Sequence, residues 1–301
     1  MALFNSPYHR QNKTSTNFNV QEYVDGLDIY IPNLDLSNCQ LTTIPDLSKF
    51  VNLKSFKCSK NNLISLPTLP KCLRELYCYE NQLTQLPELP PNLKVLACGD
   101  NNIIQLPKLP VNLDMLICSN NKLKQLPDLP KKLNKLYCSN NLITQLPIMS
   151  NYLAILSCYE NRLTTLPKLS KKLVVLNCYN NQITRLPTLP DTLLQVSCGN
   201  NCISYIPPLS EKQHIERFDL INNPIYDIVS QNSNKTIQEV LKIIYNAKKT
   251  YYTLKYGNKI RNFLYIKVLE PNAQQKYHPN NLIKLLNEHS EEIVDELLST
   301  W

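Results

Sequence analysis

The sequence predicts a solenoid of short coils that stack one parallel β-strand on the next. Three observations support this fold class: a cysteine, an asparagine and a leucine each return every twenty residues. A fixed period of this length is typical of solenoids, in which each unit buries its apolar face against its neighbours. The cysteines are Cys58, Cys78, Cys98, Cys118, Cys138, Cys158, Cys178 and Cys198, with asparagines from Asn61 to Asn201 and leucines from Leu53 to Leu193 in step with them.

The repeating unit reads L-x-x-L-x-C-x-x-N-x-L-x-x-L-P-x-L-P-x-x, and its positions are numbered here from the first leucine. The residues at positions 4 and 6 point to the same side of a short strand, which we expect to be the core. The asparagine at position 9 lies where the chain turns, and its amide can satisfy backbone groups that a leucine would leave unpaired. Each Leu-Pro pair favours an extended outer wall, because proline fixes φ and disfavours helix at the preceding residue.

Two degenerate units flank the eight regular ones, each offset from its neighbour by 22 residues instead of 20. The first runs from Ile31 to Ile44 with Cys39 in the asparagine slot, and the last runs from Ile215 to Ile225. We therefore expect a solenoid of about ten coils over residues 31–229, preceded by an N-terminal tail and partial cap over residues 1–30.

Residues 230–301 change to a helical pattern. Thr236 and Glu239 form a capping box, and apolar residues follow at helical spacing. Pro279 and Ser290 can open further helices. The sequence predicts a small helical C-terminal domain, which is either a cap that protects the open core or a separate docking module.

The periodic cysteines allow three interpretations: buried core residues, metal ligands or disulfides. Reduced cysteine is a favoured core residue, whereas a zinc site needs closely spaced Cys/His pairs. The four histidines lie outside the regular coils, and the closest cysteines are Cys198 and Cys202. We interpret the column as buried thiols, with no metal and no cofactor.

Composition and motifs disfavour catalysis and membrane insertion. The chain has 301 residues, only four glycines and a net charge of +8, and it shows no Gly-rich phosphate loop or Ser-His-Asp set. It lacks the apolar core of a signal peptide at its start and has no apolar run long enough to span a membrane. The sequence predicts a non-enzymatic cytoplasmic protein with reduced thiols.

The doubled Leu-Pro coil, as in LPELPPNLKVLACGDNNIIQLP, resembles the short leucine-rich repeats of bacterial effector proteins over roughly residues 50 to 210. Some of those effectors carry a C-terminal ubiquitin-ligase domain with a catalytic cysteine. No cysteine follows Cys202 here and the tail is too short, so that activity is not transferred. The composition and the run LEPNAQQKYHPNNLIKLLNE also resemble uncharacterised giant-DNA-virus proteins, which implies no activity.

The residues at positions 3, 5, 7 and 8 are expected to face away from the core, on the concave side. Apolar and aromatic residues gather there in the middle coils, which is typical of a protein-binding patch. The alternative is that β-branched and aromatic residues are simply good strand formers. The candidate partner-binding residues are Tyr77, Tyr79, Val95, Met115, Ile117, Tyr137, Ile155, Tyr159, Val175 and Tyr179.

Charge favours a protein partner over nucleic acid. These four rows hold three basic and four acidic residues, so no basic stripe lines the expected contact face. We interpret the basic residues of the outer turns as a solvated surface: Lys108, Lys124, Lys131, Lys132, Lys168, Lys171, Lys172 and Arg185. The sequence thus predicts a protein-interaction scaffold, or alternatively an adaptor that recruits a target to other machinery, such as ubiquitin ligation, through its C-terminal helices.

Overall fold

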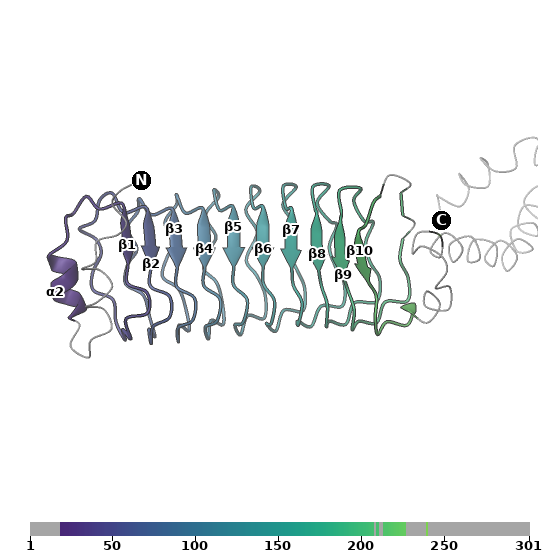
Figure 1. The fold of residues 1–301 in the computed structure, drawn as a ribbon, viewed down its shortest axis with the longest axis horizontal. Helices are drawn as coiled ribbons and strands as arrows, with labels where there is room; N and C mark the ends of the chain where they lie inside the picture. Colours follow the sequence, from purple (N-terminus) through teal and green to yellow (C-terminus); the bar gives the residue numbers. More distant parts are fainter. Residues whose placement is uncertain (1–18, 208, 211–212, 227–238, 240–301) are drawn as a thin grey trace, which may run out of the picture. The chain divides into compact units, whose positions relative to one another are not determined.

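The computed structural model describes residues 19–207, 209–210, 213–226 and 239, and within them the chain forms one parallel sheet (Figure 1). Its ten strands follow one another in chain order, so each coil adds one strand beside the previous one. The strands are β1 (Asn33–Asp35), β2 (Ser55–Lys57), β3 (Glu75–Tyr77), β4 (Val95–Ala97), β5 (Met115–Ile117), β6 (Lys135–Tyr137), β7 (Ile155–Ser157), β8 (Val175–Asn177), β9 (Gln195–Ser197) and β10 (Arg217–Asp219).

The register of the sheet follows the sequence period. Each residue of β2 to β8 pairs with the residue twenty places further on, as in Leu96 and Leu116. The two outer steps have the longer offset that the degenerate units predict: Leu34 pairs with Phe56, and Val196 with Phe218. The predicted solenoid is confirmed, with each regular coil presenting the same positions to the core.

The core is a set of stacked columns that run from coil to coil. The cysteines of the regular coils are buried, and so are the residues at positions 1, 4 and 11. In β1, β3, β5, β6, β8 and β9 only the middle residue of the strand is buried, and in the regular coils the cysteine at position 6 continues the alternation beyond the strand. Each leucine that is fully buried stabilises the fold by about 2 kcal/mol. A coil can bury its leucines only by stacking against its neighbours.

The asparagine column joins successive coils. Asn141 donates from Nδ2 to the backbone oxygens of Cys118, Cys138 and Ser139 at 3.1–3.2 Å. Its Oδ1 accepts the N–H of Leu123 at 3.0 Å, in the preceding coil. The same contacts recur with Asn61, Asn81, Asn101, Asn121, Asn161, Asn181 and Asn201. The predicted role of this residue in satisfying turn backbone is therefore confirmed.

Position 8 adopts a left-handed backbone in every regular coil, with φ between 50° and 59°. Asparagine and aspartate tolerate this conformation better than other residues with a side chain, because their short polar groups bond locally. Five of the eight regular coils carry one of them there. The exceptions are Lys60, Glu80 and Glu160, which hold the same conformation at a steric cost.

The outer wall contains no helix within the coils that the structure describes, in agreement with the Leu-Pro pattern. The chain turns back towards the sheet where the position 18 carbonyl accepts the position 1 N–H, as from Leu113 to Pro110 at 3.1 Å. Serine replaces this proline at Ser150 and Ser170. Both carbonyl groups still accept the position 1 N–H, and the hydroxyls also donate to the preceding coil, with Ser150 reaching the Lys131 oxygen at 2.7 Å.

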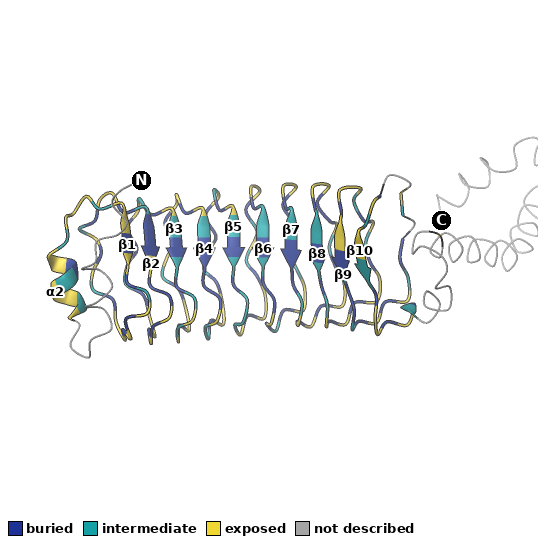
Figure 2. Cartoon of the chain, in the orientation of Figure 1, coloured by how far each residue is buried: buried dark blue, intermediate teal, exposed yellow. Residues whose placement is uncertain are grey.

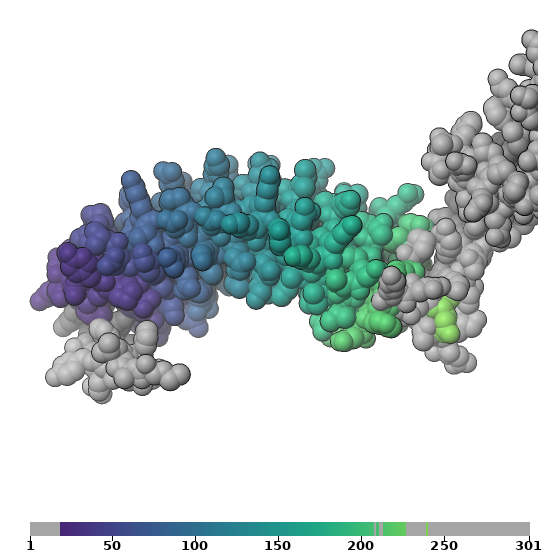
Figure 3. All heavy atoms as spheres, turned by 90° about the horizontal axis from the view of Figure 1, so that it is seen from above, coloured from purple at the N-terminus to yellow at the C-terminus, as the bar shows by residue number. Residues whose placement is uncertain are grey.

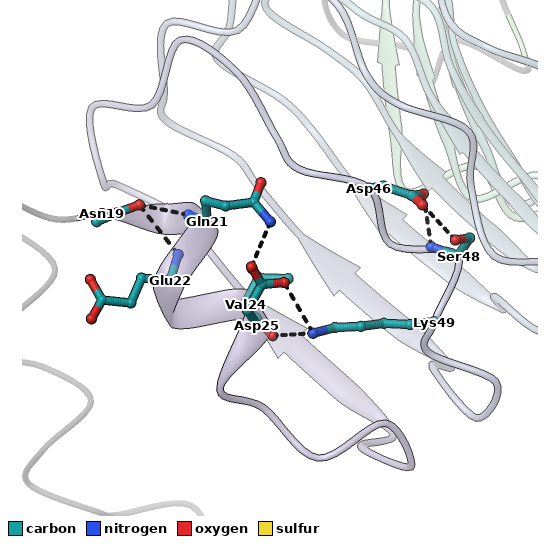
Figure 4. A network of polar contacts seen from close by, with 8 residues as sticks. All are labelled: Asn19, Gln21, Glu22, Val24, Asp25, Asp46, Ser48 and Lys49. Carbon is teal, nitrogen blue, oxygen red and sulfur yellow. Dashed lines mark hydrogen bonds and ion pairs between the residues drawn. The ribbon is translucent and has the colours of Figure 1, made fainter.

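A short helix, α2 (Val20–Asp25), lies against the first coil. Asn19 begins it, because its side chain accepts the N–H groups of the first turn. Figure 4 shows Lys49 reaching the end of this helix, where its ammonium donates to the Val24 oxygen at 2.7 Å and meets the Asp25 carboxylate at 3.4 Å. Val24 is fully buried. This helix lies within residues 1–30, where a partial cap is predicted; residues 1–18 lie outside the described part.

The last described coil is less regular than the others. Ile215 and Phe218 are only half-buried, although both fit the core positions of the template. Gln213 is buried instead, and its side-chain amide donates to the oxygens of Leu189 and Pro190. The predicted helical domain over residues 230–301 lies outside the described residues, apart from Glu239.

Candidate interaction surface

One face of the sheet is turned towards solvent along the whole stack. In β3, β5, β6 and β8 the middle residue is buried and both flanking residues are half-buried, a pattern visible along the strands in Figure 2. Positions 3 and 5 therefore face outward, as the alternation predicts. We call the outward residues at positions 3, 5 and 7 the exposed sheet face.

The register brings the apolar candidates together in two patches. Val95 lies directly opposite Met115, and Ile117 lies opposite Tyr137. Further along the stack, Ile155 lies opposite Val175. Lys135 stands between Met115 and Ile155 in the same row and separates the two patches. All ten sequence-predicted residues are half-buried, so each presents part of its side chain to solvent.

Tyr179 is held in place by its neighbours on the face. Its hydroxyl accepts a hydrogen bond from Asn200 Nδ2 at 2.6 Å. Its ring lies over Gly199, where an added Cβ would come within 3.1 Å of the ring. The absence of a side chain at Gly199 therefore leaves room for the Tyr179 ring. The Tyr179 side chain is thus already oriented in the unbound protein.

The face becomes polar at β2 and β3. Ser55 donates to Glu75 at 3.1 Å, and the Lys57 ammonium lies 5.6 Å from the centre of the Tyr77 ring. Burial raises the pKa of Tyr77, and the neighbouring Glu75 raises it further. The apolar patches are thus bounded on this side by charged and hydrogen-bonded groups.

Sequence reasoning missed the row at position 2, which precedes each strand. Its later members, Ala154, Val174 and Leu194, are apolar, and Leu194 is 36% exposed. Backbone bonds from Leu194 to Val174 and from Val174 to Ala154 place them side by side, next to the patch of Ile155 and Val175. The twenty-residue spacing shows that these residues form a row. Strand alternation does not tell which side of the sheet the row faces, because position 2 precedes the strand.

The buried thiols of the cysteine column are in the protonated, unreactive form. Burial raises the pKa of Cys98 and of Cys138 from 9.0 to about 12, so these thiols stay protonated at neutral pH. Off the column, Cys72 is half-buried and donates to the Leu53 oxygen at 3.1 Å, while Cys202 is exposed. In the described ranges no three His, Cys, Asp or Glu side chains cluster in a way that could hold a metal ion.

Within the same described residues, none of the helices has the length and apolar character that crossing a membrane requires.

Comparison with known proteins finds relatives by structure. No protein-family model matches the chain, and no curated protein sequence matches it. The chain is similar to YopM from Yersinia enterocolitica, at 30% identity and a TM-score of 0.57, covering 68% of this chain and 49% of that one. It is also similar to a chain of the octameric complex of Latrophilin 3, Unc5D and FLRT2, at 25% identity and a TM-score of 0.56, covering 66% and 70%. A Shigella effector leucine-rich repeat domain matches at 24% identity and a TM-score of 0.42, covering 72% and 81%.

The chain spans about half the length of the Yersinia enterocolitica protein that it matches. The similarity covers 68% of this chain, and the fold of the described residues has a twenty-residue register and ten parallel strands. The described part of this chain is a leucine-rich repeat solenoid with short coils, similar to the leucine-rich repeats of bacterial effector proteins.

Proposed function

We propose that the protein is a non-enzymatic interaction scaffold that binds a protein partner through the exposed sheet face. The observation that carries the proposal is the patch formed by Val95, Met115 and Ile117, which lie on neighbouring strands and face solvent. Apolar side chains on a solvated sheet face are unfavourable unless another surface covers them. Methionine and tyrosine, both present here, are enriched where proteins bind one another.

The structural relatives support a protein partner. FLRT2, which supplies the leucine-rich repeats of the octameric complex, is assembled there with two other proteins. A held side chain such as Tyr179 also suits binding, because less conformational freedom is lost when a partner docks on an ordered residue. The adaptor alternative depends on residues 230–301, which lie outside the described part of the chain.

Affinity capture from the natural host cell tests the proposal with matched variants. Met115→Glu with Ile117→Glu places two charges in the larger patch. The control, Ile104→Glu with Ile148→Glu, makes the same kind of change at two apolar residues of the outer turns and wall, which are 65% and 89% exposed. We expect a protein that wild type and control both retain and that the face variant loses by about tenfold or more.

Circular dichroism and the thermal midpoint of each variant establish that the solenoid is intact. If the face variant is folded and retains the same proteins as wild type, the exposed sheet face is not the contact surface and the proposal fails.

A further inference from the structure

A band of positive charge lies beside the exposed sheet face, at the end where the strands begin. Position 2 carries a basic residue in three neighbouring coils, and the turn at positions 19 and 20 adds more. We call this set the basic rim: Lys54, Lys71, Arg74, Lys94, Lys131, Lys132, Lys171 and Lys172. Figure 3 views the stack along the strands and shows side chains repeating in rows from coil to coil.

Backbone bonds fix the first three basic residues of position 2 side by side. The N–H of Arg74 donates to the Lys54 oxygen at 2.8 Å, and the N–H of Lys94 donates to the Arg74 oxygen at 2.7 Å. Their side chains therefore project from adjacent backbone segments, at roughly the 4.8 Å spacing of neighbouring strands. Like charges placed opposite each other in this way repel and destabilise the sheet.

The carboxylates of the described residues form no ion pair with these cations, although Asp114 follows Lys94 in the position 2 row, joined to it by a backbone bond of 2.8 Å. Within the described residues, none of the basic rim forms an ion pair; the two ion pairs present there involve Lys49 and Lys60. Other coils place Asn134, Ala154 or Val174 at position 2, so the fold itself does not require a cation there. A surface of one sign of charge attracts an oppositely charged partner and raises its local concentration.

The rim also concentrates the charge of the molecule. Over residues 51–194, the three positions that form it hold eight basic residues against two acidic ones, Asp114 and Asp191, a net charge of +6. Position 8, in the turn that follows each strand, holds Lys60 against Glu80, Asp100 and Glu160 in the same coils. A partner that lies across the sheet therefore meets opposite charge at its two sides.

This asymmetry favours a protein partner over a nucleic acid. Tyr79 and Tyr159, which could stack on bases, lie at position 7, directly beside the acidic Glu80 and Glu160. The tyrosine at the rim positions, Tyr152, already has the Lys172 ammonium 4.3 Å from the centre of its ring. A strand whose bases stacked there would bring its phosphates towards those carboxylates and away from the rim. A protein segment can carry acidic residues along one side alone.

We propose that the basic rim is a binding surface for an acidic protein segment, separate from the apolar patches of the exposed sheet face. The segment lies along the strand-entry turns and brings its carboxylates to the rim lysines and Arg74. The rim then steers an acidic partner on to the face beside it, because complementary charge raises the rate of encounter.

Fluorescence anisotropy with the full-length protein tests this inference. The probe is a short fluorescein-labelled peptide of alternating glutamate and alanine, compared with its glutamine counterpart and with a labelled poly-uridine RNA of similar length. The rim variant is Lys54→Glu, Arg74→Glu, Lys94→Glu. The matched control, Lys108→Glu, Lys124→Glu, Lys168→Glu, makes the same change in net charge at exposed residues away from the rim.

We expect the glutamate peptide to bind wild type, to bind more weakly as salt rises from about 50 to 200 mM, and to lose about tenfold or more in affinity with the rim variant. The outer-wall control should lose less than about threefold, and the glutamine peptide should bind weakly to all variants. A further variant, Met115→Ser with Ile117→Ser, should bind the glutamate peptide as wild type does, because the apolar patch is not part of the rim.

Four results overturn the inference: no binding of the glutamate peptide to wild type, equal losses in the rim variant and the outer-wall control, a loss in the Met115→Ser, Ile117→Ser variant that matches the rim variant, or tighter rim-dependent binding of the RNA. The last would assign the rim to nucleic acid instead. Because capture by the apolar patch is measured with different variants, each proposal can fail while the other stands.

Discussion

The asparagine at position 9 links its own turn to the coil before it through a single amide. Asn141 is buried, and its amide uses both its donor and its acceptor atoms on backbone groups. Backbone groups in a turn of this kind have no ladder partner of their own, so the side chain supplies what regular secondary structure would supply elsewhere. The column of asparagines is therefore as much a part of the fold as the column of leucines.

Replacing Asn141 by leucine should destabilise the protein by about 2–4 kcal/mol, because the Leu123 N–H and three carbonyl groups lose their partner in a buried site. Urea unfolding followed by circular dichroism measures the change. Gln125→Leu, at an exposed position of the preceding coil, is the control and should change stability by less than about 0.5 kcal/mol. Equal effects of the two substitutions would contradict the role of the amide.

The column of buried thiols should make the protein less stable at alkaline pH. Burial raises the pKa of Cys98 and Cys138 to about 12, against 9.0 in the unfolded chain. The folded state therefore keeps these protons while the unfolded state releases them. Stability should be independent of these thiols below about pH 9 and should fall as pH rises towards 12, by roughly 1.4 kcal/mol per thiol per pH unit.

Urea midpoints between about pH 8 and pH 11 measure this loss. The variant Cys138→Ala removes one thiol and should make the decline with pH less steep, even though it lowers stability at neutral pH by leaving a small cavity. An identical pH slope in wild type and variant would show that buried thiols do not set the alkaline limit.

At the scale of the element, each coil is too short to stand alone, and the helix α2 supplies an end for the stack. Lys49 joins the two, since its ammonium donates to the Val24 oxygen at the last turn of α2. A cation at the C-terminal end of a helix is favourable, because the carbonyl groups there have no partner within the helix. The contact fixes the cap to the turn before β2.

Lys49→Met should loosen this cap and cost about 1 kcal/mol, because the bond to Val24 is lost while the apolar stem remains. Hydrogen exchange of the α2 amides, such as that of Tyr23, should become faster, with exchange in β5 and β6 unchanged. Lys108→Met, on the outer wall, serves as the control. Uniformly faster exchange in every strand would mean that Lys49 acts on the whole fold and not on the cap.

The elements could be predicted from the sequence to the extent that they repeat. Cys98 and Asn101 each had one physical explanation that fitted all eight coils, so the strands, the register and the buried column followed from it. The left-handed turn at position 8 was missed because Glu80 and Glu160 are poor indicators of it, and the stacked coils impose that conformation on them. The end coils were predicted less well, as half-buried Phe218 shows, because a terminal coil lacks one of the two neighbours that define its core.

The candidate site was predictable in part for the same reason. Alternation assigns Met115 and Ile117 to the outward side of a strand, and the structure places them there. The direction of Lys54 and Leu194 depends on the turn that leads into the strand, and strand alternation does not assign a side to a residue before the strand. The basic rim and the apolar end of the position 2 row therefore emerged only once the coils were stacked.

At the scale of the whole molecule, the solenoid behaves as a series of equivalent units joined by neighbour contacts. Removing residues 102–121 deletes one full period and joins Asn101 to Lys122, so every remaining residue keeps its position in the template. Strand β4 then pairs with β6 in the register that β5 held. The shortened protein should fold, with a urea m-value lower by about a tenth and a modest loss of stability, because one coil and one interface are gone.

Removing residues 102–111 deletes half as many residues but should do more harm. It joins Asn101 to Asn112 and leaves too little chain to form an outer wall between β4 and β5. That variant should lose the single cooperative transition, with the coils on either side unfolding separately or not folding at all. Circular dichroism and urea unfolding of the two deletions decide the matter: if the longer deletion is the more damaging one, the coils are not interchangeable and the molecule depends on contacts beyond nearest neighbours.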